Sequence, residues 1–432
     1  MDERRSIREA RAALANGSTD PVTLAKLALR SANRNSGGNT YLWRDPAWTE
    51  SEAGRAAAVP RGEGGRFGDG RSDLWGIPIS VKDCFDLAGA PTSCGVRFYR
   101  DVNGVAVNDS WLVEQSRNSG AVITGKTHLH PLAYGITGEN PEFGDCEQPD
   151  NPGALTGGSS SGAAASVLEG SAMAAIGTDT GGSVRAPAAL CGLVGYRASI
   201  GRGDWRGGSH LAQSFDTMGW LFRDLEDGPL LAHTFAPGRA PAIREFKRFA
   251  LVHDDFLHDC EGEIVTSFRT VTDELHALGL RSTTVNVDWW AKSFDIFSPI
   301  QAWEAARIHA GNFDRVQPAI RERLEWGARI TDSELSILRE RHAEFRSRVD
   351  ELFHEHELIA LPASPVARLD VGADHSNARS RILRYTTPFS LAGVPVVTIT
   401  CRIGGVQLAA GRECDESLLE MAAKIGSRRR QR

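Results

Sequence analysis

The sequence of 432 residues lacks the features that mark several protein classes. It has no apolar run of the roughly 18 residues that a membrane-spanning helix needs. Lys and Arg number 49 against 55 Asp and Glu, for a net charge of −6, and no basic stripe offers a face to nucleic acid. Hydrophobic residues make up 41% and charged residues 24%, which excludes a disordered, fibrous or membrane-bundle protein. We therefore expect a globular chain that binds neither nucleic acid nor membrane.

The cysteines and histidines also lack the patterns of a disulfide framework or a metal site. The seven cysteines are scattered, odd in number and include no Cys-x-x-Cys pair, which is typical of reduced cysteines in a cytosolic protein. The pairs His354 and His356, and His253 and His258, have no third and fourth ligand. The first residues, MDERRSIREARAALANG, contain no apolar core of signal-peptide length. We expect a cytoplasmic protein with no metal and no cofactor.

The chain divides near residue 74. Ile7, Ala10 and Leu14 recur at helical spacing, and Pro21 follows a capping Asp20, which together predict an N-terminal helical region. Residues 49–73 are rich in Gly, Ala, Glu and Arg and are typical of a flexible surface connection. We expect residues 1–73 to form this helical region and connection, and residues 74–432 to form one domain. That domain has a small-residue-rich core over about 74–223 and a more charged, helical and sheet-completing region over 224–432.

Short apolar segments alternate with helical ones from residue 74 onward. We expect strands at 77–81, 121–124, 172–176, 358–361, 394–400 and 406–410. We expect helices at 109–118, at 163–170, from Pro187, and after the capping box formed by Thr331 and Glu334. This alternation predicts an α/β fold with a mixed sheet. The C-terminal residues SRRRQR are expected to be a solvated end rather than a nucleic-acid arm.

Three segments bring reactive and small residues together. They are Ile79-Ser-Val-Lys82-Asp83, Gly157-Gly-Ser-Ser-Ser-Gly162 and Gly177-Thr-Asp-Thr-Gly-Gly-Ser-Val-Arg185. A serine hydroxyl is a weak nucleophile until a base takes its proton, and the usual base is His. The nearest histidines, His128, His130 and His210, lie outside these segments. The glycines do not form a phosphate loop, because no Lys follows them.

Lys82 can replace His as the base. It ends a predicted buried strand with apolar neighbours Ile79 and Val81, and desolvation disfavours the charged ammonium. Consecutive N–H groups from Thr180 to Ser183, unshielded by large side chains, can hold an oxyanion. Cys84 has no His close to it in the sequence, so it is a poor alternative nucleophile.

These segments resemble the amidase signature family. The pattern GGSSSG followed by GTDTGGSVRAPAALCG is close to the pattern that defines the family, and the serines at 159 and 183 are 24 residues apart, as they are in the family. The resemblance covers about 150 residues, from 74 to 223, and thins beyond Arg223. It implies the amidase signature fold, a central mixed, twisted β-sheet covered by helices on both faces.

The resemblance also assigns roles, residue by residue. Ser183 corresponds to the nucleophile, Lys82 to the base, and Ser159 to a bridging serine that follows a non-proline cis peptide. The remaining assignments are backbone N–H groups of Thr180, Gly181, Gly182 and Ser183 for the oxyanion hole, Ser160 as a supporting hydrogen-bonding serine, and Asp179 and Arg185 as braces of the loop.

Two departures from the family pattern concern the surroundings of the triad. Leu155-Thr156 stands where a proline usually precedes GGSS, and Arg402-Ile-Gly-Gly-Val406 stands where Gly-Leu-Pro-Val-Gly is usual. Within the family, the stretches from Ala133 to Asn140 and from Leu211 to Trp220 are similar to plant indole-3-acetamide amidohydrolases. Chloroplast import-receptor relatives share these stretches but have lost catalytic residues. We expect Tyr134, Gly158 and Trp205 to contact substrate, although core packing is the usual role of any single aromatic residue.

The resemblance implies an amidohydrolase that cleaves a small carboxamide through an acyl group on Ser183, with an aryl- or indolyl-acetamide as a candidate substrate. Three alternatives stay open. The chain could be the glutaminase subunit of a tRNA amidotransferase, a catalytically silent interaction protein, or an enzyme that transfers the acyl group to an amine. The expected partner is a small-molecule amide, and a homodimer is left open, because oligomeric state cannot be read from the sequence.

Overall fold

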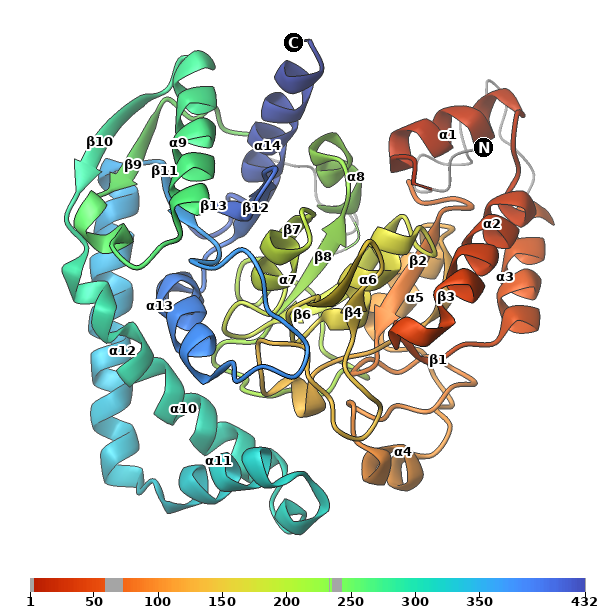
Figure 1. The fold of residues 1–432 in the computed structure, drawn as a ribbon, viewed down its shortest axis with the longest axis horizontal. Coiled ribbons are helices and arrows are strands. Elements are labelled where there is room, and N and C mark those ends of the chain that lie inside the picture. Colours follow the sequence, from red (N-terminus) through yellow and green to blue (C-terminus); the bar gives the residue numbers. More distant parts are fainter. Residues whose placement is uncertain (1–3, 59–72, 233, 235–242, 432) are drawn as a thin grey trace.

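The computed structural model describes residues 4–58, 73–232, 234 and 243–431, and an eleven-stranded mixed sheet forms its centre (Figure 1). In spatial order the strands are β1 (Tyr41–Trp43), β3 (Val122–Thr127), β2 (Pro78–Lys82), β6 (Ala174–Asp179), β8 (Thr217–Phe222), β7 (Val194–Arg197), β12 (Val396–Thr400), β13 (Gly405–Ala410), β11 (Leu358–Pro362), β9 (Arg248–Val252) and β10 (Arg281–Val285). A second sheet pairs β4 (Glu147–Gln148) with β5 (Asn151–Leu155).

Helices flank the large sheet, and Figure 1 shows the N-terminal helices on one side of the molecule and α9 to α12 on the other. The helices are α1 (Ile7–Asn16), α2 (Pro21–Arg34), α3 (Pro46–Ala58), α4 (Arg97–Asn103), α5 (Trp111–Asn118), α6 (Ser161–Glu169), α7 (Arg185–Leu190), α8 (Gly228–Ala232), α9 (Gly262–Ala277), α10 (Ser293–Ile308), α11 (Pro318–Arg329), α12 (Asp332–Glu355), α13 (Ser376–Ala392) and α14 (Asp415–Arg430). β2 runs parallel to β3 and β6, whereas β7 and β8 are antiparallel to their neighbours. The predicted α/β class with a mixed sheet is confirmed.

Local sequence signals account for many of these boundaries. The Asp20 side chain accepts a hydrogen bond from the Thr23 N–H and caps α2, whose first residue is Pro21. Thr331 and Glu334 form the predicted capping box of α12. Every residue of β2, β6, β8 and β13 is buried, so the apolar runs that predicted β2, β6 and β13 form the centre of the core.

One expectation about a surface segment is wrong, and another holds only for the last residues. Residues 49–58, expected to begin a flexible connection, belong to α3, because their alanines favour helix and Glu52 is buried in an ion pair with Arg117. Residues 59–72 of that connection lie outside the described residues. The basic end is solvated at Arg430 and Gln431 as expected, but it belongs to α14, and Arg429 binds the Glu274 carboxylate at 2.8 Å.

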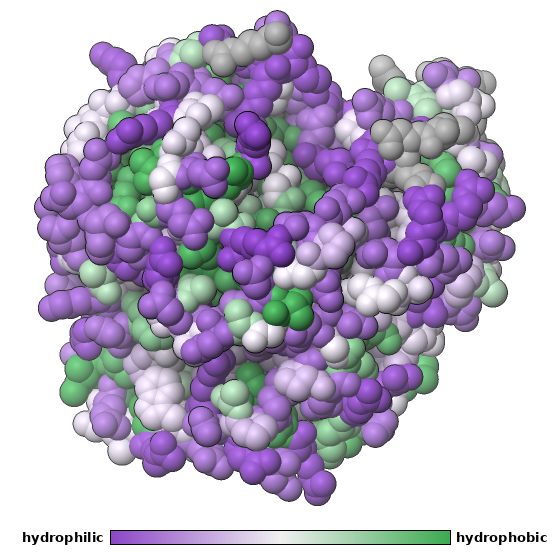
Figure 2. All heavy atoms as spheres, in the orientation of Figure 1, coloured by the Kyte–Doolittle hydropathy of each residue, from purple (hydrophilic) through white to green (hydrophobic). Residues whose placement is uncertain are grey.

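The surface agrees with the balanced composition. Figure 2 shows that hydrophilic residues dominate this face, and that hydrophobic residues gather in a hollow over the strands near the C-terminus. Within the described ranges, no helix combines the length and the apolar character needed to cross a membrane. All seven cysteines are unpaired.

Candidate active site

The site begins where two parallel strands end. β2 and β6 pair in parallel with Val81 opposite Ile176, so both strands finish at the same edge of the sheet. Lys82 is the last residue of β2, and Thr178 and Asp179 are the last residues of β6. Ligand sites in α/β proteins lie outside the carboxyl ends of such strands. The pairing register therefore brings the first and third segments of the sequence pattern together.

The second segment reaches the same edge through α6. This helix packs on β2 and β6, and its start follows directly after Ser159 and Ser160. Close packing requires glycine at position 162, where a Cβ would lie 2.2 Å from the Thr40 carbonyl oxygen and 2.4 Å from the His128 nitrogen. The peptide bond between Gly158 and Ser159 is cis, as the resemblance implied.

The Lys82 ammonium group lies among three hydroxyls. Its Nζ is 2.7 Å from Ser159 Oγ, 3.1 Å from Ser160 Oγ and 2.7 Å from Thr178 Oγ1. All of these side chains are buried. A charged lysine has three N–H donors and no acceptor, so these three hydroxyl oxygens, each accepting from Nζ, satisfy all of its donors.

Burial also prepares Lys82 to act as a base. Desolvation lowers the pKa of Lys82 to about 8, against smaller opposing effects of Cys84, Asp179 and Asp216. With that pKa, about a tenth of the lysine is neutral at pH 7. Burial raises the pKa of the neighbouring Cys84 thiol to about 11. Cys84 is therefore a thiol rather than a nucleophilic thiolate at neutral pH.

Ser183 lies on the wall of a narrow pocket beside this cluster. The Ser160 N–H donates to the Ser183 carbonyl oxygen at 3.2 Å, which ties the two serine segments together. The Ser183 side chain itself makes no hydrogen bond with any residue that the structure describes. The pocket is lined by Ala133, Tyr134, Gly135, Ile136, Thr180, Gly181, Ser183, Gln301, Arg379 and Leu383.

The loop from Thr180 to Ser183 is organised by the Asp179 carboxylate. Asp179 accepts hydrogen bonds from the N–H groups of Gly182 at 2.9 Å and Val184 at 3.1 Å. The Gly182 N–H, which was expected to face an oxyanion, is therefore committed to Asp179. No protein acceptor among the described residues takes the N–H groups of Thr180, Gly181 or Ser183, so these three stay available to a developing oxyanion.

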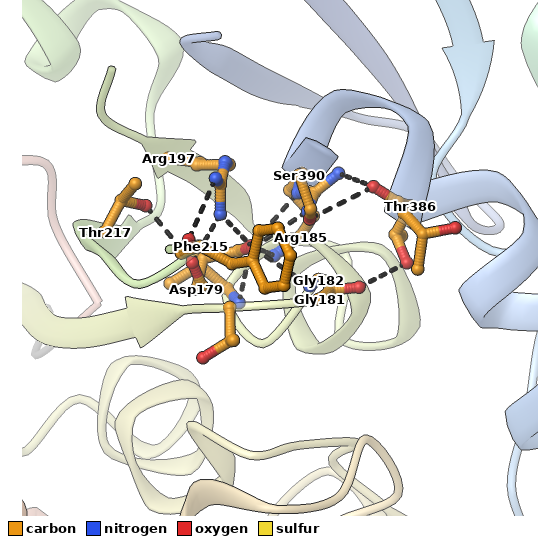
Figure 3. A network of polar contacts seen from close by, with 12 residues as sticks. Asp179, Gly181, Gly182, Arg185, Arg197, Phe215, Thr217, Thr386 and Ser390 are labelled. Atoms are coloured by element: carbon orange, nitrogen blue, oxygen red, sulfur yellow. Dashed lines mark hydrogen bonds and ion pairs between the residues drawn. The ribbon is translucent and has the colours of Figure 1, made fainter. Parts of the chain in front are cut away.

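Two buried arginines hold Asp179 in place (Figure 3). Arg185 and Arg197 each contact Asp179 Oδ1 at 2.8 Å, and all three side chains are fully buried. Burial raises the pKa of Asp179, but the positive charges of Arg185 and Arg197 outweigh it and hold that pKa well below its usual range. Arg185 also binds the Thr386 carbonyl and Ser390 of α13, each at 2.8 Å. The loop is thus anchored to an element about 200 residues away in the chain.

The three residues expected to contact substrate lie in different surroundings. Tyr134 lines the pocket. Gly158 approaches Gly138 so closely that a Cβ would lie 2.8 Å from the Gly138 nitrogen, so it packs against a neighbouring loop. Trp205 is half-buried and stacks on Phe85 and on His210. Substrate contact by Gly158 and Trp205 stays a prediction.

Several residues of the site were missed in the sequence. Thr178 lies inside the segment from Gly177 to Arg185. Its position next to Asp179, which was assigned to the site from the sequence, could have identified it. Gln301 of α10 and Arg379 and Leu383 of α13 also line the pocket, and no sequence pattern singled them out. Among the described residues, no group of three or more His, Cys, Asp or Glu is arranged to hold a metal ion.

Comparison with known proteins identifies the family. The sequence matches the profile of the family described as Amidase over residues 46–419. The chain belongs to the amidase family. A structure described as "Crystal structure of amidase" superposes with a TM-score of 0.88 at 27% identity, covering 98% of this chain and 100% of that one. The fold class predicted from the resemblance is thereby confirmed, as is the assignment as an amide-cleaving enzyme.

Curated relatives within the amidase family carry different names. An indoleacetamide hydrolase of Pseudomonas savastanoi is 30% identical over 415 residues, covering 90% of this chain and 87% of the relative. A 2-amino-5-chloromuconic acid deaminase of Comamonas testosteroni is 29% identical over 367 residues, covering 78% and 77%. A glutamyl-tRNA(Gln) amidotransferase subunit of Nitratidesulfovibrio vulgaris (strain DP4) is 28% identical over 417 residues, covering 83% and 84%. The family relationship therefore establishes the amidase chemistry and leaves the substrate open.

Proposed function

We propose that this amidase hydrolyses a small carboxamide through an acyl-Ser183 intermediate, with Lys82 as the base and Ser159 as the bridge. The observation that carries the proposal is the buried contact of 2.7 Å between Lys82 Nζ and Ser159 Oγ, beside a pocket that Ser183 lines. We disfavour a catalytically silent role as an interaction protein. Burying a lysine among neutral hydroxyls destabilises the folded state, and a buried lysine with a lowered pKa is typical of a functional site.

The proposed reaction runs in two stages. Neutral Lys82 takes a proton from Ser159, which takes one from Ser183, and Ser183 Oγ forms a bond to the amide carbon. The oxyanion is stabilised by N–H groups of Thr180, Gly181 and Ser183. The C–N bond then breaks, the relay returns the proton to nitrogen, and ammonia or an amine leaves. Water repeats the sequence on the ester, which releases the carboxylic acid and regenerates Ser183.

The finer description of the substrate is also a proposal. An aryl- or indolyl-acetamide is supported by the indoleacetamide hydrolase relative, and by Tyr134 on the pocket wall. A glutaminase component of a tRNA amidotransferase is the second candidate, supported by the relative from N. vulgaris. A cytoplasmic location and a homodimer stay predictions.

The test is ammonia release from indole-3-acetamide, phenylacetamide, benzamide, glutamine, allophanate and malonamate. Wild-type protein and Ser183→Ala are compared in parallel, with circular dichroism to show that both are folded. We expect Ser183→Ala to lower turnover by at least about 10⁴-fold, as in other serine hydrolases that lose the nucleophile. Turnover retained by Ser183→Ala would contradict the mechanism, and release from glutamine that needs added partner chains would favour the amidotransferase role.

A further inference from the structure

One charged residue on the pocket wall lacks a counter-charge. Arg379, from the first turn of α13, lines the same pocket as Ser183. Its Nε is buried without a hydrogen-bond partner, and its side chain makes no ion pair with any residue in the described part of the chain. An unpaired buried guanidinium donor is unfavourable by itself. Arg381 of the same helix also has a buried Nε without a hydrogen bond, but that Nε lies 3.7 Å from the Asp259 carboxylate, so the missing counter-charge is what distinguishes Arg379.

Its neighbours on α13 show what an ordinary structural arginine looks like here. Arg381 and Arg384 both face Asp259, with closest ion-pair contacts of 3.7 Å and 2.7 Å. The Arg381 side chain also donates to the Asp259 carbonyl. Asp259 thus neutralises two arginines of α13 that do not line the pocket, whereas the third, Arg379, lines it without such a partner.

A second arginine adds positive charge at the same place. Arg323 of α11 donates to the Tyr134 carbonyl oxygen at 2.5 Å and lies 5.4 Å from the centre of the Tyr134 ring. Burial and the nearby Arg323 lower the pKa of Arg379 to about 10, which leaves Arg379 charged at neutral pH. Glu139 and Glu322 are acids close enough to act on Arg323. The Glu139 carboxylate already accepts from Thr137 at 2.6 Å and contacts His375 at 3.2 Å, and Glu322 does not line the pocket.

The pocket is also small. Its free space is about 20 Å³, whereas one water molecule needs roughly 10–15 Å³. An indole ring fits only if the wall moves, while a chain of a few atoms fits with little change. The residues that line the pocket include no Asp or Glu, so nothing on the described wall repels an anion.

We propose that the substrate is an anionic amide, a monoamide of a short dicarboxylic acid, whose carboxylate binds Arg379 while its carboxamide meets Ser183. Arg323 strengthens the positive potential and holds Tyr134. This inference rests on the proposed amidase chemistry at Ser183 and sets an anionic short-chain amide against the aryl- and indolyl-acetamides named under the proposed function. A carboxylate supplies the counter-charge that the Arg379 guanidinium lacks, and charge-assisted contacts of this kind are the strong ones.

The experiment compares matched pairs of anionic and neutral amides. Malonamate is paired with acetoacetamide and succinamate with 4-oxopentanamide, in which a methyl group replaces the carboxylate oxygen. We expect wild-type kcat/KM to favour the anionic member by about 10²-fold, and Arg379→Met to remove that preference by lowering kcat/KM for the anionic member far more than for the neutral one. Arg379→Lys should retain part of the preference for the anionic member. Arg381→Met changes a residue outside the pocket lining and should show the wild-type preference.

A binding measurement separates this inference from the proposed function. The Ser183→Ala protein is titrated calorimetrically with malonamate and succinamate and with their neutral partners, with and without Arg379→Met. If the anionic member binds more tightly than its neutral partner and Arg379→Met abolishes this difference, the anion site is supported. If the wild-type protein then turns over no amide, only the proposed catalytic function is contradicted. Equal affinity within each pair, no binding of either member, or turnover that prefers the neutral amides overturns the anionic substrate and leaves the amidase chemistry standing.

Discussion

The segment from 74 to 223 and the region from 224 to 432 contribute to the site in different ways. The first provides Lys82, Ser159 and Ser183, together with a buried polar network in which Asp179 meets Arg185 and Arg197. The second provides Gln301, Leu383 and Arg379 on the pocket wall. Reactive groups need fixed geometry and are built from buried strand ends and tight loops. The pocket-wall residues that the later region adds are instead carried by the helices α10 and α13.

The largest effect that sharpens this contrast is expected at Lys82. Lys82→Met preserves the length of the side chain but removes the proposed base, and no other basic side chain in the described part of the chain is hydrogen-bonded to Ser159 Oγ. We expect kcat to fall about 10³- to 10⁴-fold, in the range for loss of a general base, with a circular dichroism spectrum like that of wild type. Wild-type turnover by Lys82→Met at pH 7 would show that the first segment does not contain the base.

A large effect on stability is expected at Asp179. Asp179→Asn leaves Arg185 and Arg197 buried beside a neutral amide, and breaking a buried ion pair costs about 3–5 kcal/mol. Urea unfolding should show this loss. The control is Asp350→Asn in the later region, because Asp350 and Arg412 are 2.7 Å apart but each about one-third exposed, and such a pair contributes at most about 1 kcal/mol. Equal losses of unfolding free energy in Asp179→Asn and Asp350→Asn would contradict the view that the buried network of the first region is more stabilising than the exposed ion pair of the second.

Sequence alone predicted the reactive groups better than the pocket, for a physical reason. Ser159, Ser183 and Lys82 are recognisable because small residues must surround them in a fixed order, which leaves a dense local pattern. Arg379 leaves no such pattern, because one arginine among several on α13 becomes distinctive only when Asp259 is seen to pair with the others. The Ala-rich helix α3 was missed because its composition resembles that of a connection.

The pH dependence of catalysis offers a finer test. Lys82 acts when neutral, so kcat/KM should rise about tenfold per pH unit below its pKa of about 8 and level off above it. Burial lowers the pKa of His130 to about 3 and raises that of Tyr134 to about 12, so these two neighbours keep one protonation state between pH 5 and 9. A neutral amide is the right probe, because its own charge does not change. A flat profile over this interval would contradict Lys82 as the base.

The smallest expected effect is a shift of that profile in Thr178→Val. Thr178 Oγ1 accepts a hydrogen bond from Lys82 Nζ at 2.7 Å, and a hydrogen bond to the charged form favours that form. Its removal should therefore lower the Lys82 pKa, moving the midpoint of kcat/KM to lower pH by less than about one unit. Ser80→Ala is the control. Ser80 lies on β2, the strand that carries Lys82, and its buried hydroxyl is hydrogen-bonded to Ser166 at 2.8 Å instead of to Lys82. An equal shift in both variants would mean that general loosening of the strand end, and not the contact to Nζ, sets the pKa of the base.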